Sequence, residues 1–467
     1  MTAESAAVDP LRRAFESGLT RPYRWRRSQL LELRRMLLDN RQAFENALTQ
    51  DLGKHPVESD ITEIGVLVGE IDHALRRLKR WMRPSPVHIP LALAPGSARI
   101  VHEPLGVVLI IGPWNCPLQL ILAPLIGALA AGNTAIIKPS EIAAATSATL
   151  ADLVPRYLDR RAIRVVEGDA DITGKLLEQR LDHVFFTGSE QVGRVVAAAA
   201  AKTLTPVTLE LGGKSPVYID GTVDAAVAAR RIMWGKLLNA GQTCVAPDYV
   251  LATPATARAL IPHLQRAVRQ MYGTDPESSD DYGSIITEKH TRRLAALLEG
   301  QPVSFGGAVS VPKRFVAPTV IDGASPSSAI MHEEIFGPVL PIVHVHSAEE
   351  ARAFIRARPK PLATYVFTRD GGVRKAFVAE TSSGALSFGA PAVHLGAPKL
   401  PFGGVGASGV GSYHGKHSFT TFSHAKAVLD KPLHPDSMRL AYPPYGGRLK
   451  GLLLWLLTGV RGAPRSR

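Results

Sequence analysis

A carboxylate and a thiol stand in unusual settings near the middle of this 467-residue chain. Glu210 ends the strand-like run Val207-Thr-Leu-Glu210 before a Gly-Gly turn, and Cys244 follows Asn239-Ala-Gly-Gln-Thr. Side chains at the ends of elements can face a cleft. Because a free thiol with a pKa of about 8.5 is only slightly ionised at neutral pH, a cysteine nucleophile needs a nearby base or positive field. Together the two residues suggest covalent catalysis, although each alone also fits a structural role.

Two further motifs place polar side chains after apolar, strand-like runs. Asn115 follows Val107-Val-Leu-Ile-Ile111 and a tight turn, and its amide can donate a hydrogen bond to an oxyanion. Lys138 and Glu141 follow Ala135-Ile-Ile, and a cation with a carboxylate three residues later suits the hydroxyl groups of a ribose. These motifs favour a site that binds a nucleotide and stabilises a charged oxygen.

Two more motifs suit the remaining parts of a dinucleotide. Residues 183–193 read as a strand, a glycine turn at Gly188 and an alanine-rich helix, whose first amides can point at a phosphate. Glu334 lies two residues before Phe336, so a carboxylate and an aromatic ring can position a flat heterocycle. The spacing from Gly188 to Gly193 lacks the middle glycine of the usual dinucleotide pattern. Residues 404–409 match that pattern formally, but they follow a loop and are interpreted as a turn-rich connection.

The ordered motifs resemble those of the aldehyde dehydrogenases, most closely the class 3 branch with its fatty-aldehyde and aromatic-aldehyde enzymes. The match extends to Phe402-Gly-Gly-Val-Gly and Tyr413-His-Gly-Lys-His-Ser-Phe419, about nine-tenths of the chain. The resemblance implies that Cys244 is the nucleophile, Glu210 the general base and Asn115 the oxyanion donor. It implies that the cofactor contacts are Trp114, Lys138, Ser140, Glu141, Gly188, Ser189, Gly193, Leu211, Glu334 and Phe336.

These residue types can carry one reaction. The Cys244 thiolate adds to an aldehyde, the hemithioacetal loses hydride to a nicotinamide, and Glu210 activates the water that hydrolyses the thioester. We expect medium-chain, long-chain or aromatic aldehydes as substrates. We also expect NAD as the cofactor with NADP tolerated, because Glu141 would repel a 2′-phosphate. The alternatives are an acylating enzyme that uses coenzyme A, against which Glu210 argues, and an idle lipid-surface protein, against which the intact catalytic set argues.

Strand-like and helical runs alternate from about Ile100 to Asp220, which predicts an α/β protein with a doubly wound parallel sheet. The resemblance adds an α/β catalytic domain and a small arm that pairs subunits into a homodimer, with a strand near 420–424. The expected divisions are a cofactor domain at 1–83 and 105–212, an arm at 84–104 and 418–430, a catalytic domain at 213–404 and a tail at 431–467.

The net charge of +13 includes arginine clusters in amphipathic helical patterns, with Leu30, Leu33, Leu37 and Phe44 at core-facing spacing. No nucleic-acid module accompanies the charge, so no nucleic-acid partner is expected. The apolar tail segment 451–460 is flanked by basic residues, which suits either packing on the protein or peripheral contact with an anionic membrane. Two cysteines, no metal-ligand spacing and no signal-peptide profile indicate a cytoplasmic protein without disulfides or a metal.

The role of Cys116 is open, and a phosphate-loop interpretation of Lys214-Ser215 is rejected. In the resembling family an aromatic residue usually follows the oxyanion asparagine, whereas this chain has Cys116. Cys116 could widen the substrate pocket and approach Cys244, or it could be a small buried side chain. Lys214-Ser215 resembles the end of a phosphate loop, but Thr208 stands where the first glycine is required, so that interpretation fails.

Overall fold

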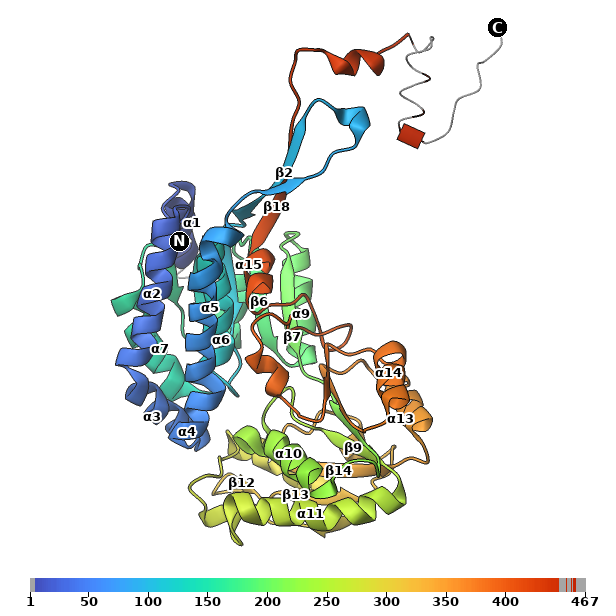
Figure 1. The fold of residues 1–467 in the computed structure, drawn as a ribbon. Coiled ribbons are helices and arrows are strands. Elements are labelled where there is room, and N and C mark those ends of the chain that lie inside the picture. Colours follow the sequence, from blue (N-terminus) through green and yellow to red (C-terminus); the bar gives the residue numbers. More distant parts are fainter. Residues whose placement is uncertain (1–4, 445–450, 452–454, 456, 459–467) are drawn as a thin grey trace.

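The computed structural model describes residues 5–444, 451, 455, 457 and 458, and it has two α/β lobes with a projecting arm (Figure 1). The first lobe is built on a six-stranded sheet in the order β17-β7-β6-β3-β4-β5. Its strands β3 to β7 are parallel and β17 is antiparallel to β7. The strands are β3 (Val107–Ile111), β4 (Thr134–Lys138), β5 (Ile163–Val165), β6 (His183–Gly188), β7 (Val207–Leu211) and β17 (Gly409–Val410).

Helices cover both faces of this sheet, as the alternation of buried side chains along β3 shows. Val108 and Ile110 belong to one apolar cluster, and Val107, Leu109 and Ile111 belong to another. The first face packs against α2 (Tyr23–Asp39), α5 (Gly65–Trp81), α6 (Gln119–Ala131) and α7 (Ala144–Tyr157), and the second against α1 (Ser5–Glu16), α8 (Ala170–Leu177) and α9 (Glu190–Ala201). The doubly wound architecture predicted from the sequence is therefore confirmed.

The N-terminal helices also follow the predicted core pattern. Leu30, Leu33 and Leu37 in α2 and Phe44 in α3 (Arg41–Leu52) are all fully buried. The chain then continues through α4 (Pro56–Ser59) and a π-helical turn (Asp60–Ile64) into α5. The segment 54–63 in this layer supplies Lys54, Glu58 and Glu63, and the two glutamates accept hydrogen bonds from Leu118 and Asn239.

The second lobe contains a seven-stranded sheet in the order β10-β13-β14-β9-β8-β15-β16, parallel except for β10. Its strands are β8 (Pro216–Ile219), β9 (Tyr249–Ala252), β10 (Val303–Phe305), β13 (Thr319–Asp322), β14 (Val339–His344), β15 (Ala363–Phe367) and β16 (Ala385–Phe388). Its helices are α10 (Ala225–Leu237), α11 (Pro254–Tyr272), α12 (Glu288–Leu298), α13 (Ala348–Arg356) and α14 (Gly371–Glu380), and a β11–β12 hairpin (Val309–Ser310, Phe315–Val316) stands beside it.

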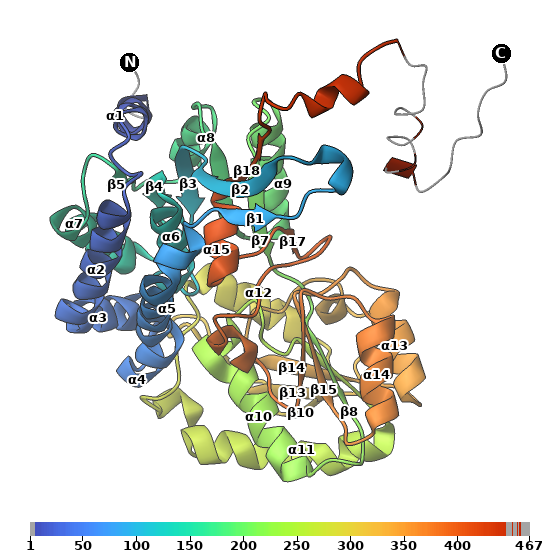
Figure 2. The same ribbon diagram turned by 45° about the horizontal axis from the view of Figure 1, so that its top comes forward.

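The arm is an antiparallel sheet of β1 (Ser85–Val87), β2 (Ser97–Pro104) and β18 (Ser423–Asp430), and it projects from the first lobe (Figures 1 and 2). β18 pairs with β2 from Ser423 opposite Pro104 to Asp430 opposite Ser97. The pairing joins segments more than 300 residues apart in the sequence.

Two element boundaries differ from the approximate ranges that the sequence patterns indicated. The stretch from Ile100 to Asp220 does not form one sheet, because β2 lies in the arm and β8 lies in the second lobe. Gly212 and Gly213 separate β7 from β8, and Gly213 has a φ of 155°, so the chain can turn from one sheet to the other. The strand expected near 420–424 begins at Ser423, because α15 (Lys416–Thr421) occupies the residues before it and packs on α6.

Most of the apolar tail segment 451–460 lies outside the described residues. No helix in the described part of the chain combines the length and the apolar character that a membrane crossing demands.

Candidate active site

Glu210 and Cys244 lie at the junction of the two lobes. Glu210 is the fourth residue of β7, is 2% exposed and is paired in the sheet with Gly409 of β17. Cys244 is partly exposed and follows a 3-10 turn (Leu238–Gly241) at the end of α10. Asn239 and Ala240 in that turn have φ values of 55° and 51°, an unfavourable conformation for residues with a Cβ. The strained turn changes the direction of the chain between α10 and the cysteine.

Hydrogen bonds tie the predicted oxyanion residue to the cysteine loop. The Asn115 side chain is 3% exposed, and its Nδ2 donates to the Gln242 carbonyl at 3.0 Å. Asn239 Nδ2 donates to the carbonyls of Asn115 and Gln242 at 2.7 and 3.1 Å. The structure therefore brings Asn115, from the first lobe, against the loop that carries Cys244.

A buried polar cluster supports this junction from the helical layer. Lys54 and Glu63 are fully buried and form an ion pair. Glu63 Oε2 accepts hydrogen bonds from the backbone N–H groups of Leu118 and Gln119, at 2.9 and 3.1 Å, where α6 begins. Cys116 Sγ lies 4.0 Å from Lys54 Nζ. Cys116 is thus next to a buried ammonium group.

Glu58 holds the other side of the junction. One of its carboxylate oxygens accepts from the Asn239 backbone N–H at 2.6 Å. Burial raises the pKa of Glu58, while Lys54 and this hydrogen bond oppose the shift. The helical layer therefore contacts the loop of Asn115 through Glu63 and the loop of Cys244 through Glu58.

The loop that carries Glu334 and Phe336 is anchored by three charged residues. Lys214 pairs with Asp248, and its Nζ donates to the carbonyls of Ile330 and Glu333 at 2.8 Å each. Asp248 accepts from the Ile335 N–H at 2.9 Å. Lys214 fails as part of a phosphate loop, and its contacts here are with this anchoring network.

Arg293 of α12 is the third anchor. It donates to Glu333 Oε1 at 3.1 Å and to the Glu334 carbonyl at 3.3 Å, and it also contacts the Ile335 carbonyl. The Glu334 carboxylate in turn lies against Gly212, where an added Cβ would be only 2.0 Å from Oε2. A side chain at position 212 would therefore displace the Glu334 carboxylate from its present place.

Aromatic rings lie together on this side of the site. The Trp114 ring is 4.9 Å from His290 and 5.3 Å from Phe336, both in edge-on arrangements. Phe336 adopts a φ of 50°, an uncommon conformation for a bulky residue. Trp114, Phe336 and the anchored Glu334 therefore bring together residues predicted at separate motifs. No role for His290 was predicted from the sequence motifs.

The remaining predicted cofactor residues gather at the carboxyl ends of β4, β6 and β7. Lys138 is 3% exposed, and its Nζ lies 3.1 Å from both the Glu141 carboxylate and the Pro139 carbonyl. The hydroxyl of Ser140 accepts from the Ile142 N–H at 3.3 Å. Such strand ends are where ligands bind in open α/β sheets.

Gly188, Ser189, Gly193 and Leu211 form the neighbouring group. Gly188 ends β6, and Ser189 caps α9 by accepting from the Val192 N–H at 3.4 Å. Leu211 ends β7 and packs on Gly193, where a Cβ would be 2.6 Å from Leu211 Cδ2. The predicted order of strand, glycine turn and helix is therefore present.

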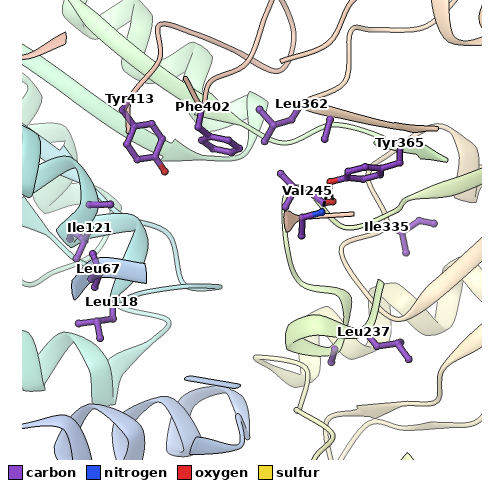
Figure 3. Close-up of a cluster of buried hydrophobic side chains, with 14 of the residues drawn as sticks. Leu67, Leu118, Ile121, Leu237, Val245, Ile335, Leu362, Tyr365, Phe402 and Tyr413 are labelled. Carbon is purple, nitrogen blue, oxygen red and sulfur yellow. Dashed lines mark hydrogen bonds between the residues drawn. The ribbon is translucent and has the colours of Figure 1, made fainter. Parts of the chain in front are cut away.

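Apolar side chains from both lobes surround the junction (Figure 3). Leu67, Leu118 and Ile121 face it from the first lobe, and Leu237, Val245 and Ile335 face it from the second. The hydroxyl of Tyr365 donates to the Val245 carbonyl at 2.5 Å and so fixes the residue after Cys244.

This apolar setting changes the acid–base properties of the site. Burial raises the pKa of Glu210 well above its usual value, and neither carboxylate oxygen has a hydrogen-bond partner among the described residues. Burial, with Glu334, Cys116 and Glu210, also raises the pKa of Cys244. Burial and then Asp248 raise the pKa of Glu334 to about 8, and burial lowers that of Lys236 to about 8.

The sequence motifs did not identify several residues that build the site. Five of them lie in helices or loops, where a polar residue is ordinarily expected to face water: Lys54, Glu58, Glu63, Asp248 and Arg293. Asn239 and Gln242 were visible within the cysteine motif but received no role. Among the described residues, no group of three or more His, Cys, Asp or Glu side chains is arranged to hold a metal ion.

A sequence profile described as the aldehyde dehydrogenase family matches residues 3–428. The chain belongs to the aldehyde dehydrogenase family, and its reaction is NAD(P)-dependent oxidation of an aldehyde. It is 48% identical to human aldehyde dehydrogenase family 3 member B1 over 95% of each chain. It is 46% identical to a rat dimeric NADP-preferring aldehyde dehydrogenase, over 95% of this chain and 98% of the rat protein.

Solved structures of aldehyde dehydrogenases are similar to this chain over most of its length. The substrate-bound Staphylococcus aureus AldH has a TM-score of 0.95 and 43% identity, over 97% of this chain and 100% of that one. A Mycobacterium tuberculosis aldehyde dehydrogenase complexed with NAD+ has a TM-score of 0.82 and 28% identity, over 93% and 92%. The predicted family, fold class and dependence on NAD or NADP are therefore confirmed.

Replacing Arg293 with methionine tests how the Glu334 loop is held. Arg293→Met removes charge-assisted hydrogen bonds to residues 333–335, each worth about 1.5–3 kcal/mol, and leaves Glu333 exposed to water. We expect KM for the cofactor to rise about tenfold, which corresponds to about 1.4 kcal/mol, with a small change in Tm. Steady-state kinetics and thermal unfolding measure both.

Arg292→Met is the matched control, because within the described part of the chain this neighbouring arginine on the same helix pairs only with the exposed Glu288. Equal cofactor KM values for the two variants would contradict the anchoring role.

The direction of the Cys244 and Glu210 pKa shifts predicts the pH dependence. Both pKa values are raised by burial, so the thiolate and the carboxylate become populated only as pH increases. We therefore expect kcat/KM to rise continuously from pH 6 to pH 9. A profile that is flat or falls over this range, with the protein still folded by circular dichroism, would refute the assignment.

Proposed function

We propose that Cys244 is the nucleophile, Glu210 the general base and Asn115 the oxyanion donor of this aldehyde dehydrogenase. The observation that carries the proposal is the hydrogen-bonded junction that holds Asn115 against the Cys244 loop. The Cys244 sulfur forms a bond to the aldehyde carbon, and the carbonyl oxygen becomes an oxyanion beside Asn115. The free hydrogen on the Asn115 amide is available to this oxygen, since one Nδ2 hydrogen already serves Gln242.

Bound NAD(P) supplies the hydride acceptor for the hemithioacetal carbon. The residues present fit such a group: an aromatic pair at Trp114 and Phe336, a buried Lys138 ammonium beside Glu141, and the Gly188–Ser189 turn at the start of α9. The anchored Glu334 loop would position the nicotinamide side, and Ser140, Gly193 and Leu211 would shape the nucleotide side. The thioester that remains on Cys244 is then hydrolysed.

Water is the acyl acceptor in this proposal. The Glu210 carboxylate has no hydrogen-bond partner in the part of the chain that the structure describes, and its pKa is raised, so its ionised form is a strong base for a water proton. A coenzyme A thiol would not require this base. The intact nucleophile, base and amide also argue against an idle lipid-surface protein on this fold.

Medium-chain, long-chain or aromatic aldehydes are the proposed substrates. Trp234 and Val393 are 38% and 52% exposed, and their segments touch because Gly235 packs against Pro391. Exposed apolar side chains on adjoining segments near the Cys244 loop suit an apolar substrate. The small Cys116 next to Asn115 supports the idea of a wide pocket, although its contact with Lys54 gives it a second role.

The assembly and location of the protein are proposed on separate grounds. Much of β18, at the edge of the arm, is exposed, and such an edge is suited to pairing in a homodimer. The name of the rat relative includes the word dimeric. We propose the division into cofactor, arm and catalytic segments stated above, and a cytoplasmic protein that also contacts anionic membranes through its tail. The charge pattern of the tail supports that contact.

Two substitutions separate the chemical steps. Cys244→Ala should abolish turnover but leave cofactor binding nearly unchanged, because the alanine cannot form the covalent adduct. Glu210→Gln should slow thioester hydrolysis at least a hundredfold and retain a rapid first release of NADH. Stopped-flow absorbance, with and without coenzyme A, distinguishes burst from turnover.

Normal turnover by Cys244→Ala would refute the nucleophile assignment. A wild-type rate that depends on coenzyme A would instead support the acylating alternative.

NAD should be preferred over NADP. The Glu141 carboxylate, which is 47% exposed, would repel a 2′-phosphate, and Lys138 only partly offsets this. Glu141→Gln should raise the NADP-to-NAD ratio of kcat/KM about fivefold, equivalent to about 1 kcal/mol of removed repulsion. A wild-type preference for NADP, as in the name of the rat relative, would overturn the role given to Glu141.

A further inference from the structure

A second cluster of ionisable side chains lies where the arm leaves the first lobe. A cleft of about 600 Å³ opens between the end of α5, the segment 83–86, β2 and the segment that leads into α15. In Figures 1 and 2 the end of α5 lies beside α15 and the base of the arm. None of the proposed catalytic or cofactor residues lines this cleft.

The cleft is lined by cations. Five side chains carry a permanent positive charge and two are imidazoles: Arg77, Arg80, Arg83, Lys399, Lys416, His73 and His102. No acidic side chain is among the described residues that line it. Like charges held together in this way repel one another, so the arrangement is unfavourable until an anion neutralises it.

The acids on the same elements are engaged elsewhere. Asp72 of α5 pairs with Arg34 at 2.8 Å, and Glu70 accepts from the Gly415 N–H. Glu103 of β2 pairs with Lys426 on the outer strand. The five cations have no ion pair or side-chain hydrogen bond within the described part of the chain. They are therefore available to an external partner.

Aromatic rings pack together at the cleft. Trp81 is 8% exposed, and its ring lies 5.8 Å from His73 and 5.7 Å from Phe419. His102 lies 5.5 Å from Phe419, and its Nδ1 is buried without a partner among the described residues. The cations thus surround a packed base, and three of them are arginines, which bind phosphate oxygens in bidentate pairs.

We infer that this cleft binds an anion that carries two or more phosphoryl groups, either a soluble phosphate ester or the headgroup of a phosphorylated lipid. Several separate cations in one cleft match several separate phosphates better than one carboxylate. The positive charges also affect the pKa values of the two histidines. After burial, the charges of Arg76, Arg77 and Lys399 lower the pKa of His73, and after burial Lys416 lowers that of His102.

Isothermal titration of the full chain with inositol 1,4,5-trisphosphate at about 0.15 M salt tests the site under moderate screening. We expect saturable binding by the wild-type protein. Arg77→Gln/Arg80→Gln/Arg83→Gln should weaken it at least tenfold while aldehyde oxidation stays unchanged. The matched control is Arg24→Gln/Arg27→Gln/Arg266→Gln, which removes the same charge from exposed arginines outside the cleft and should retain affinity within about twofold.

Vesicles of phosphatidylcholine with phosphatidylinositol 4,5-bisphosphate identify the source of the anion. Both triple variants keep the basic tail, so a difference in sedimentation between them reports the cleft. Loss by the cleft variant alone assigns a lipid headgroup, whereas trisphosphate binding without such a difference assigns a soluble ester. Equal loss of trisphosphate binding in both variants, or no saturable binding by the wild-type protein, would overturn the inference.

Discussion

Hydrogen bonds from the Asn239 side-chain amide hold a loop of the first lobe against a loop of the second. Asn239 Nδ2 donates to the carbonyls of Asn115 and Gln242, so a loop of the first lobe and the cysteine loop of the second share a single buried donor. A buried carbonyl without a partner is costly, which makes separation of the loops unfavourable. The left-handed conformation of Asn239 presents the amide in this direction, and Glu58 holds its backbone N–H. Catalytic geometry therefore depends on a residue that is outside the proposed chemistry.

The N-terminal helices extend this constraint. A fully buried ion pair such as Lys54–Glu63 is stabilising only when further hydrogen bonds satisfy its atoms. Glu63 meets that condition by accepting two N–H groups at the start of α6 and so fixes the residues that follow Asn115 and Cys116. The Cys116 thiol then lies between an ammonium group and the catalytic junction. The N-terminal helices therefore pack on the sheet and also position the loops of the site through Glu63.

Local patterns were sufficient for much of the fold and for the central residues. The apolar runs of β3, β4 and β6 and the glycine turn before α9 are visible in the sequence because burial and turn chemistry act over a few residues. Lys214, Glu58 and Glu63 were not recognised, because their partners lie in other segments and a lone polar residue in a helix usually faces water. The division after residue 212 was expected from the family resemblance and not from the local pattern, because the apolar runs on either side look alike and only long-range pairing assigns them to different sheets.

The two carboxylates near Cys244, Glu334 and Glu210, differ in how far neighbouring groups stabilise their ionised forms. Burial raises the pKa of Cys244 most, and Glu334 then contributes more to the rise than Glu210 does, so proximity alone does not identify the base. Burial and Asp248 raise the pKa of Glu334, but the Gly213 N–H, Lys214 and Lys236 oppose the shift, and its loop is fixed by Arg293. Glu210 has no such compensation among the described residues, so its carboxylate is the less stabilised anion and the stronger base. The anchored Glu334 suits binding, and the uncompensated Glu210 suits proton transfer.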